Sequence, residues 1–128
     1  MSEPTVINLA ISRDVLMTSN MRLHWATKAR HTKVIRDMAY VMATHPKRQL
    51  MPAATLEVVA KWGNRRARDA ANIEPTAKAA IDGCVDAGLL TDDSQRYLKH
   101  VGYSIADDTH NTPGVACYLT LTFTEVTL

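Results

Sequence analysis

The fold is decided most clearly by residues 115–127, VACYLTLTFTEVT, in which apolar and polar side chains alternate. Cys117, Leu119, Leu121 and Phe123 fall on one face of an extended chain, because successive side chains of a strand point to opposite faces. The intervening side chains are mostly threonine. Such alternation is typical of a half-buried strand, which we therefore expect over this stretch.

Three more strands and two helices are predicted upstream of this strand. The helices end at recognisable residues: Pro46 restricts His45 to extended conformations, and Gly88 suits the left-handed residue that closes a helix. Pro75 is tolerated only in a first helical turn, so the second helix should begin close to Asn72. The predicted strands span residues 5–11, 54–62 and 97–105, and the predicted helices span residues 24–44 and 72–87.

Each predicted helix carries a stripe of apolar residues at helical spacing, which we expect to face the core. The first stripe consists of Val34, Ile35, Met38, Val41 and Met42. The second consists of Ile73, Ala77, Ala80, Ile81 and Cys84. The expected architecture is a single α+β domain over residues 1–128, in the order β-α-β-α-β-β, with a mixed β-sheet and two main helices on it.

The composition of the chain indicates the cellular compartment in which the protein works. The chain of 128 residues has no apolar run of the ~20 residues that a membrane span needs, and its N-terminus lacks the pattern of a secretory signal. Cys84 and Cys117 are isolated, with no disulfide framework. We expect a cytoplasmic protein without membrane contact.

Charge is distributed unevenly along the chain. Residues 22–36 contain five basic side chains and no acid, and residues 61–68 contain four more. Residues 69–93 then hold six acids against the single Lys78. Basic clusters are typical of proteins that bind a phosphate backbone, and an acidic cluster is typical of a site for a hard divalent cation. The alternative is that these charges are solvated faces of helices and loops.

The acidic cluster centres on Asp69 and the pair Asp92-Asp93. If the end of the second strand and the turn after the second helix lie at the same sheet edge, these carboxylates converge. Carboxylates in close contact repel one another unless a cation binds them. The donors are oxygen only, which favours Mg²⁺ or Mn²⁺ over Zn²⁺. Asp69 as a helix cap and Asp92 and Asp93 as turn residues are the alternatives.

The run from the arginines to the paired acids resembles the signature of the RusA-type Holliday-junction resolvases. Residues 20–25, NMRLHW, are similar to a segment that follows the first strand in that family. Two features differ: about three residues are added around residues 74–77, and Ala71 stands where the family has a second acid. The matching positions are Arg68, Asp69, Asn72, Lys78, Asp82, Ala87-Gly88 and Asp92-Asp93.

The resemblance implies a metal-dependent endonuclease, of phage or prophage origin, that resolves four-way DNA junctions in recombination and repair. It implies a homodimer that uses Mg²⁺ or Mn²⁺ and no small-molecule cofactor. Asp69 and Asp93 would bind the metal, and Asp92, Asn72 or water would make up the coordination that Ala71 cannot supply. Lys78 would lie near the scissile phosphate, and Asp82 is a weaker candidate. The alternatives are a junction-binding protein with weak or no catalysis, and a nuclease of broader branched-DNA specificity.

Basic and aromatic residues complete the expected DNA surface. Trp25 is expected to anchor the core, with stacking on an exposed base as the alternative. His24 and His31 are expected to be surface or capping residues. Arginine suits bidentate phosphate contacts, although a basic loop is also a common neutral feature. The expected phosphate contacts are Arg65, Arg66 and Arg68 in the loop, Arg22 before the first helix, and Lys28, Arg30, Lys33 and Arg36 along that helix.

Overall fold

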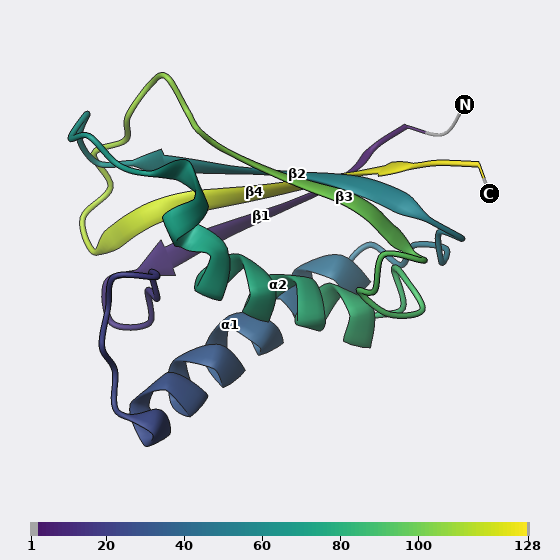
Figure 1. Cartoon of the computed structure of the whole chain (residues 1–128), viewed down its shortest axis with the longest axis horizontal. Coiled ribbons are helices and arrows are strands. Elements are labelled where there is room, and N and C mark those ends of the chain that lie inside the picture. The colour runs from purple at the N-terminus through teal and green to yellow at the C-terminus, as the bar shows by residue number, and fades with distance from the viewer. Residues whose placement is uncertain (1–2, 128) are drawn as a thin grey trace.

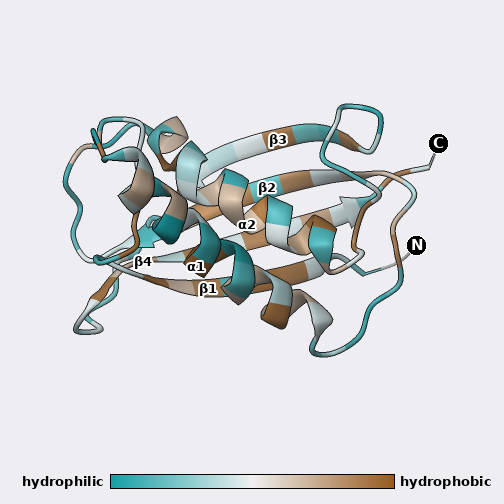
Figure 2. Ribbon diagram, turned by 90° about the horizontal axis from the view of Figure 1, so that it is seen from below, coloured by the Kyte–Doolittle hydropathy of each residue, from teal (hydrophilic) through white to brown (hydrophobic). Residues whose placement is uncertain are grey.

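Two helices lie side by side against one face of a four-stranded sheet in the computed structural model, which describes residues 3–127 (Figures 1 and 2). The chain order confirms the predicted β-α-β-α-β-β domain. The elements are β1 (Thr5–Ser12), α1 (Trp25–Thr44), β2 (Ala54–Trp62), the 3₁₀ turn η1 (Ala70–Ile73), α2 (Glu74–Asp86), β3 (Leu98–Ile105) and β4 (Val115–Glu125).

The sheet has the order β1-β4-β2-β3 and is mixed, as predicted. The strongly alternating strand β4 is central and pairs antiparallel with both β1 and β2. β2 pairs in parallel with β3, and α2 supplies the crossover between them. β4 ends at Glu125, two residues before the predicted end.

The core lies between the sheet and the helices. Cys117, Leu119, Leu121 and Phe123 of β4 are fully buried, as their alternation predicts. Leu56, Val58 and Ala60 of β2 and Ile7, Leu9 and Ile11 of β1 extend the same inward face. Burial raises the pKa of the Cys84 and Cys117 thiols to about 12, so both cysteines are inert core residues.

The predicted apolar stripe of α2 is confirmed, since all five of its residues are buried. The start of α2 differs from the prediction. The chain first makes the 3₁₀ turn η1, and the α-helix begins at Glu74, with Pro75 in its first turn. Gly88 has a φ of 87° and closes the helix as expected.

The predicted stripe of α1 is wrong in part. Ile35 is buried, but Val34, Val41 and Met42 are 38%, 53% and 43% exposed. The residues that α1 buries are His31, Ile35, Ala39 and Ala43, spaced four apart. Two of these four residues are alanines, and α1 packs closely on α2 at Ala39. The apolar residues that the periodicity assigned to the core remain on the surface.

Gly83 permits this close approach of the two helices. A Cβ atom at this position would overlap the carbonyl oxygen of Arg36 and lie 2.9 Å from the Ala39 Cβ. We therefore expect Gly83→Ala to lower the free energy of unfolding by about 1–3 kcal/mol, measured by urea denaturation. Gly63→Ala is the control, since its nearest neighbour lies 3.7 Å away. Equal stability of the two variants would contradict this account of the packing.

Within residues 3–127, neither helix is long and apolar enough to cross a membrane.

Candidate active site

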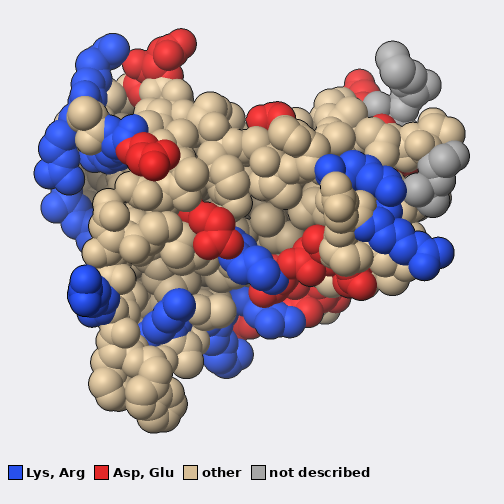
Figure 3. Space-filling model, viewed as in Figure 1, with Lys and Arg blue, Asp and Glu red and all other residues tan. Residues whose placement is uncertain are grey.

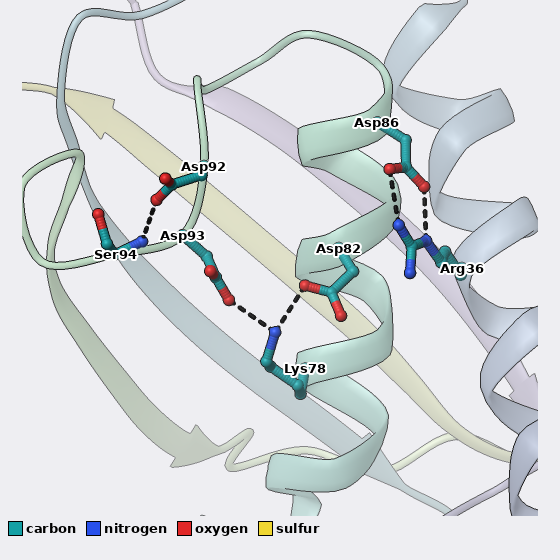
Figure 4. A network of polar contacts seen from close by, with 7 residues as sticks. All are labelled: Arg36, Lys78, Asp82, Asp86, Asp92, Asp93 and Ser94. Atoms are coloured by element: carbon teal, nitrogen blue, oxygen red, sulfur yellow. Dashed lines mark hydrogen bonds and ion pairs between the residues drawn. The ribbon is translucent and has the colours of Figure 1, made fainter.

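Lys78 lies between two carboxylates that are 11 residues apart in the sequence (Figure 4). Its Nζ donates to Asp82 Oδ1 at 2.6 Å, one helical turn along α2, and to Asp93 Oδ2 at 2.6 Å. Asp93 follows α2 in the sequence and points back toward that helix. We call Lys78, Asp82 and Asp93 the α2 cluster. Lys78 and Asp93 were predicted site residues, and Asp82 was the weaker candidate.

The two carboxylates favour a positive charge between them. Burial by itself would lower the pKa of Lys78, but the hydrogen bonds to Asp82 and Asp93 outweigh it, and the pKa is raised. The Asp82 side chain is 25% exposed and that of Asp93 is 36% exposed. The α2 cluster is therefore open enough to meet a charged ligand and is chemically suited to hold a cation.

Asp69 and Asp92 take part in local turns instead. Asp69 Oδ1 accepts a hydrogen bond from the Ala71 amide at 3.0 Å and caps η1. Asp92 Oδ1 accepts from the Ser94 amide at 2.6 Å, and this bond lowers the pKa of Asp92. The capping and turn interpretations therefore hold for these contacts. The role of either carboxylate as a metal ligand stays a prediction.

The strand ends do not bring the two acidic segments together. In the parallel pair, Ala54 at the start of β2 lies opposite Leu98 at the start of β3. Asp69 follows the far end of β2, whereas Asp92 and Asp93 precede β3. The two segments thus leave opposite ends of this strand pair, and the shared sheet edge on which the convergence depended is not formed.

The oxygen donors of the α2 cluster are of the kind that magnesium binds in proteins. Across residues 3–127 there is no group of three His, Cys, Asp or Glu side chains placed to hold a metal. Mg²⁺ commonly binds through only one or two carboxylates, with water and substrate phosphate completing its shell. Asp82 and Asp93, which face the same ammonium group, can supply such a pair.

The arginine loop between β2 and η1, which contains Arg65, Arg66 and Arg68, is a separate basic feature of the surface. The guanidinium carbon of Arg68 lies 4.2 Å from the centre of the Trp62 ring. Arg68 also donates to the backbone oxygens of Asn64 and Arg66 and to Asn64 Oδ1 at 3.1–3.2 Å. Burial lowers the pKa of Arg68, and the neighbouring Arg66 lowers it further. Figure 3 shows basic side chains gathered at the end of the molecule where Figure 1 places this loop.

The basic face of α1 is smaller than predicted. Arg36 binds Asp86 of α2 with both Nε and an η nitrogen, at 2.5 and 2.8 Å (Figure 4). This hydrogen bond raises the pKa of Arg36 and lowers that of Asp86. Arg36 thus connects the two helices and is a poor phosphate contact.

The other basic residues of this face differ in their partners. Lys33 pairs with Asp37 at 2.9 Å. By contrast, Arg22, Lys28 and Arg30 have no acidic partner among residues 3–127.

Trp25 is not a core anchor: its side chain is 76% exposed. It is the first residue of α1, where the helix extends away from the sheet (Figure 1). His24 caps this helix through Nδ1, as one of the predicted alternatives has it. His31 is only 9% exposed, which corrects its expected surface position, because it belongs to the buried face of α1.

Trp62 and Arg13 were not predicted as site residues. Both line hollows of the surface beside the arginine loop. The position of Trp62 at the end of a predicted strand, directly before that loop, was the available signal. No such signal existed for Arg13, because it is brought to the loop only by the pairing of β4 with both β1 and β2.

Comparison of the chain with protein-family models and with curated proteins finds no match. The likeness to the RusA-type resolvases therefore rests on the motif residues.

Proposed function

We propose that the protein is a metal-dependent endonuclease that acts on four-way DNA junctions, with the α2 cluster as its reacting centre. The observation that carries this proposal is the contact of one lysine with two carboxylates from separate segments. Two facing carboxylates suit a divalent cation, and a lysine beside them suits a phosphate whose negative charge grows during hydrolysis. The unpaired basic residues of the arginine loop supply a surface for the DNA backbone.

In this proposal the residues of the α2 cluster have separate roles. Asp82 and Asp93 hold a divalent ion, Mg²⁺ or Mn²⁺. When bound, that ion supplies Lewis-acid chemistry, which activates water and polarises the phosphoryl oxygens. Lys78 neutralises the charge that develops on those oxygens. Arg65, Arg66 and Arg68 position the strand through its phosphates.

The proposal is tested with a synthetic four-way junction and a linear duplex of the same sequence. We expect the protein to nick the junction in Mg²⁺ or Mn²⁺, to leave the duplex largely intact and to be inactive in EDTA. Junction binding without cleavage in either metal would reject the enzyme. Equal cleavage of junction and duplex would reject junction specificity.

A junction-binding protein without useful turnover is the second candidate. It is favoured by Ala71, which cannot bind metal, and by the separate position of Asp69 at the cap of η1. If Ala71 is a deficit, Ala71→Asp should raise the cleavage rate by about tenfold or more in single-turnover assays, a step of about 1.4 kcal/mol. Ala70→Asp, one residue earlier, is the matched control. An unchanged rate for Ala71→Asp would mean that Ala71 is no deficit.

We also propose that the protein works as a homodimer, since resolution needs symmetric nicks in two strands and a twofold dimer matches that symmetry. The strand β1 lies at the edge of the sheet, and a hollow of about 540 Å³ runs between it and α1. The exposed Val34, Val41 and Met42 line this hollow. Its one charged lining residue is Asp37, which is paired with Lys33, so two copies of this face do not repel each other.

Val41→Glu should dissociate this dimer, because it places a charge in the apolar face. We expect sedimentation equilibrium to give a dimer for the wild type and a monomer for the variant at micromolar concentration. The control is Tyr40→Glu, which adds the same charge at an exposed neighbour outside the hollow. A wild-type protein that is monomeric, or a Val41→Glu variant that remains dimeric, would contradict the assignment.

A further inference from the structure

Four hollows of the surface adjoin one another in a row, because each shares lining residues with the next. The first contains Trp25 and shares Lys28 with the second. The second shares Thr18 and Met21 with the third, a hollow of about 420 Å³ beside Asp69. The third shares Trp62 and two arginines with the fourth. We call this row the basic groove.

The charge of the basic groove is strongly positive. The basic residues that line the groove and have no acidic partner within residues 3–127 are Arg13, Arg22, Lys28, Arg66 and Arg68. The acids that line it are Asp37, which is paired with Lys33, and Asp69, which caps η1. A surface with this excess of unpaired cations suits a polyanion.

The two walls of the basic groove are fixed to each other. One wall is the loop between β1 and α1, and the other is η1 with the start of α2. The Ser19 amide donates to the Asn72 carbonyl at 2.9 Å. Thr76 Oγ1 donates to the Met17 carbonyl at 2.7 Å and accepts from the Met17 amide at 2.9 Å. The groove is therefore a preformed feature of the fold.

A tryptophan lies near each end of the basic groove. Trp25 is exposed beside Lys28, and the guanidinium of Arg68 stacks on the ring of Trp62. Unpaired bases stack on aromatic rings and on arginine planes, whereas paired bases within a duplex are not accessible for such stacking. Cations along a groove with aromatic platforms are typical of sites for single-stranded nucleic acid.

We infer that the basic groove binds an unpaired stretch of DNA strand, with its phosphates on the arginines and lysine and its bases on Trp25 and on the Trp62–Arg68 pair. This inference rests on the proposed function for its choice of DNA and adds the form of the substrate. The base pairs at the junction are then open, and the protein binds nucleotides that are no longer paired.

The test uses oligothymidylate of 12 nucleotides without a divalent ion, so that binding is measured apart from cleavage. Trp25→Phe leaves Trp62 as the sole tryptophan, and Trp62→Phe leaves Trp25. We expect the oligonucleotide to quench the fluorescence of both variants, and the affinity to fall steeply with salt. Trp25→Ala should bind about fivefold or more weakly. Tyr40→Ala, an exposed aromatic of the same helix outside the groove, should bind like the wild type.

The charge is tested by Arg66→Gln and Lys28→Gln, which should each weaken binding and lower the salt dependence, against Arg96→Gln outside the groove. Absence of quenching at either tryptophan would overturn the inference. So would a blunt duplex of the same length that binds as tightly as the single strand. Quenching at both tryptophans in a protein that does not cleave junctions would support the groove and reject the proposed nuclease.

Discussion

Asp93→Asn is expected to lower the single-turnover rate of junction cleavage by about 10²–10³-fold while the junction still binds. The side chain of Asp93 contacts Lys78 from a separate segment of the chain. A metal ion held by such a carboxylate stabilises the transition state by several kcal/mol. Asparagine keeps the size of the side chain but removes its charge. The measurement is cleavage with enzyme in excess, beside gel-shift affinity for the uncut junction.

Asp92→Asn is the matched control for this variant. Asp92 is the adjacent residue, but its carboxylate accepts the Ser94 amide in a turn, and an asparagine oxygen can accept the same bond. We expect its cleavage rate to stay close to that of the wild type. Equal losses in the two variants would mean that the turn, rather than the contact of Asp93 with Lys78, sets the rate.

Lys78→Gln is expected to lower the single-turnover rate of junction cleavage by about 10²–10³-fold. An effect of this size is found when one group that stabilises developing charge is removed. The variant also leaves Asp82 and Asp93 facing each other without the ammonium group between them. Its effect should be confined to cleavage, since Lys78 is one cation among many that the DNA meets. Lys47→Gln, which removes an exposed lysine after α1, should leave the rate unchanged.

If Lys78→Gln were fully active, Lys78 would have no role in the proposed chemistry, and its contacts would be structural ion pairs only. Such pairs contribute little stability when exposed, typically below about 1 kcal/mol. Thermal unfolding of the same variant separates the two outcomes. A large loss of activity without a matching loss of stability is the expected result.

The sequence predicted correctly the elements whose apolar residues all lie on one face. β4 alternates without interruption, and α2 has an apolar stripe that matches its buried face. In α1, the larger apolar residues Val41 and Met42 lie on a different face from Ala39 and Ala43. Periodicity alone favoured the larger residues, whereas the close packing permitted by Gly83 selected the small ones.

The candidate site was predictable to a smaller extent. Lys78 and Asp82 are one helical turn apart, so their contact follows from the sequence. The third member, Asp93, depends on the path of the chain after α2. Arg36 appeared to be a phosphate contact because its partner Asp86 lies 50 residues away. The exposed position of Trp25 and the stacking of Arg68 on Trp62 likewise depend on tertiary structure.

The divalent-cation centre proposed at the α2 cluster is tested by titration with Mn²⁺, followed through the relaxation of water protons. We expect the wild type and Asp69→Asn to bind the ion in the same way. We expect the double variant Asp82→Asn with Asp93→Asn to lose this binding. Retention of the ion by the double variant, with loss in Asp69→Asn, would contradict the assignment to the α2 cluster and place the metal at the η1 cap.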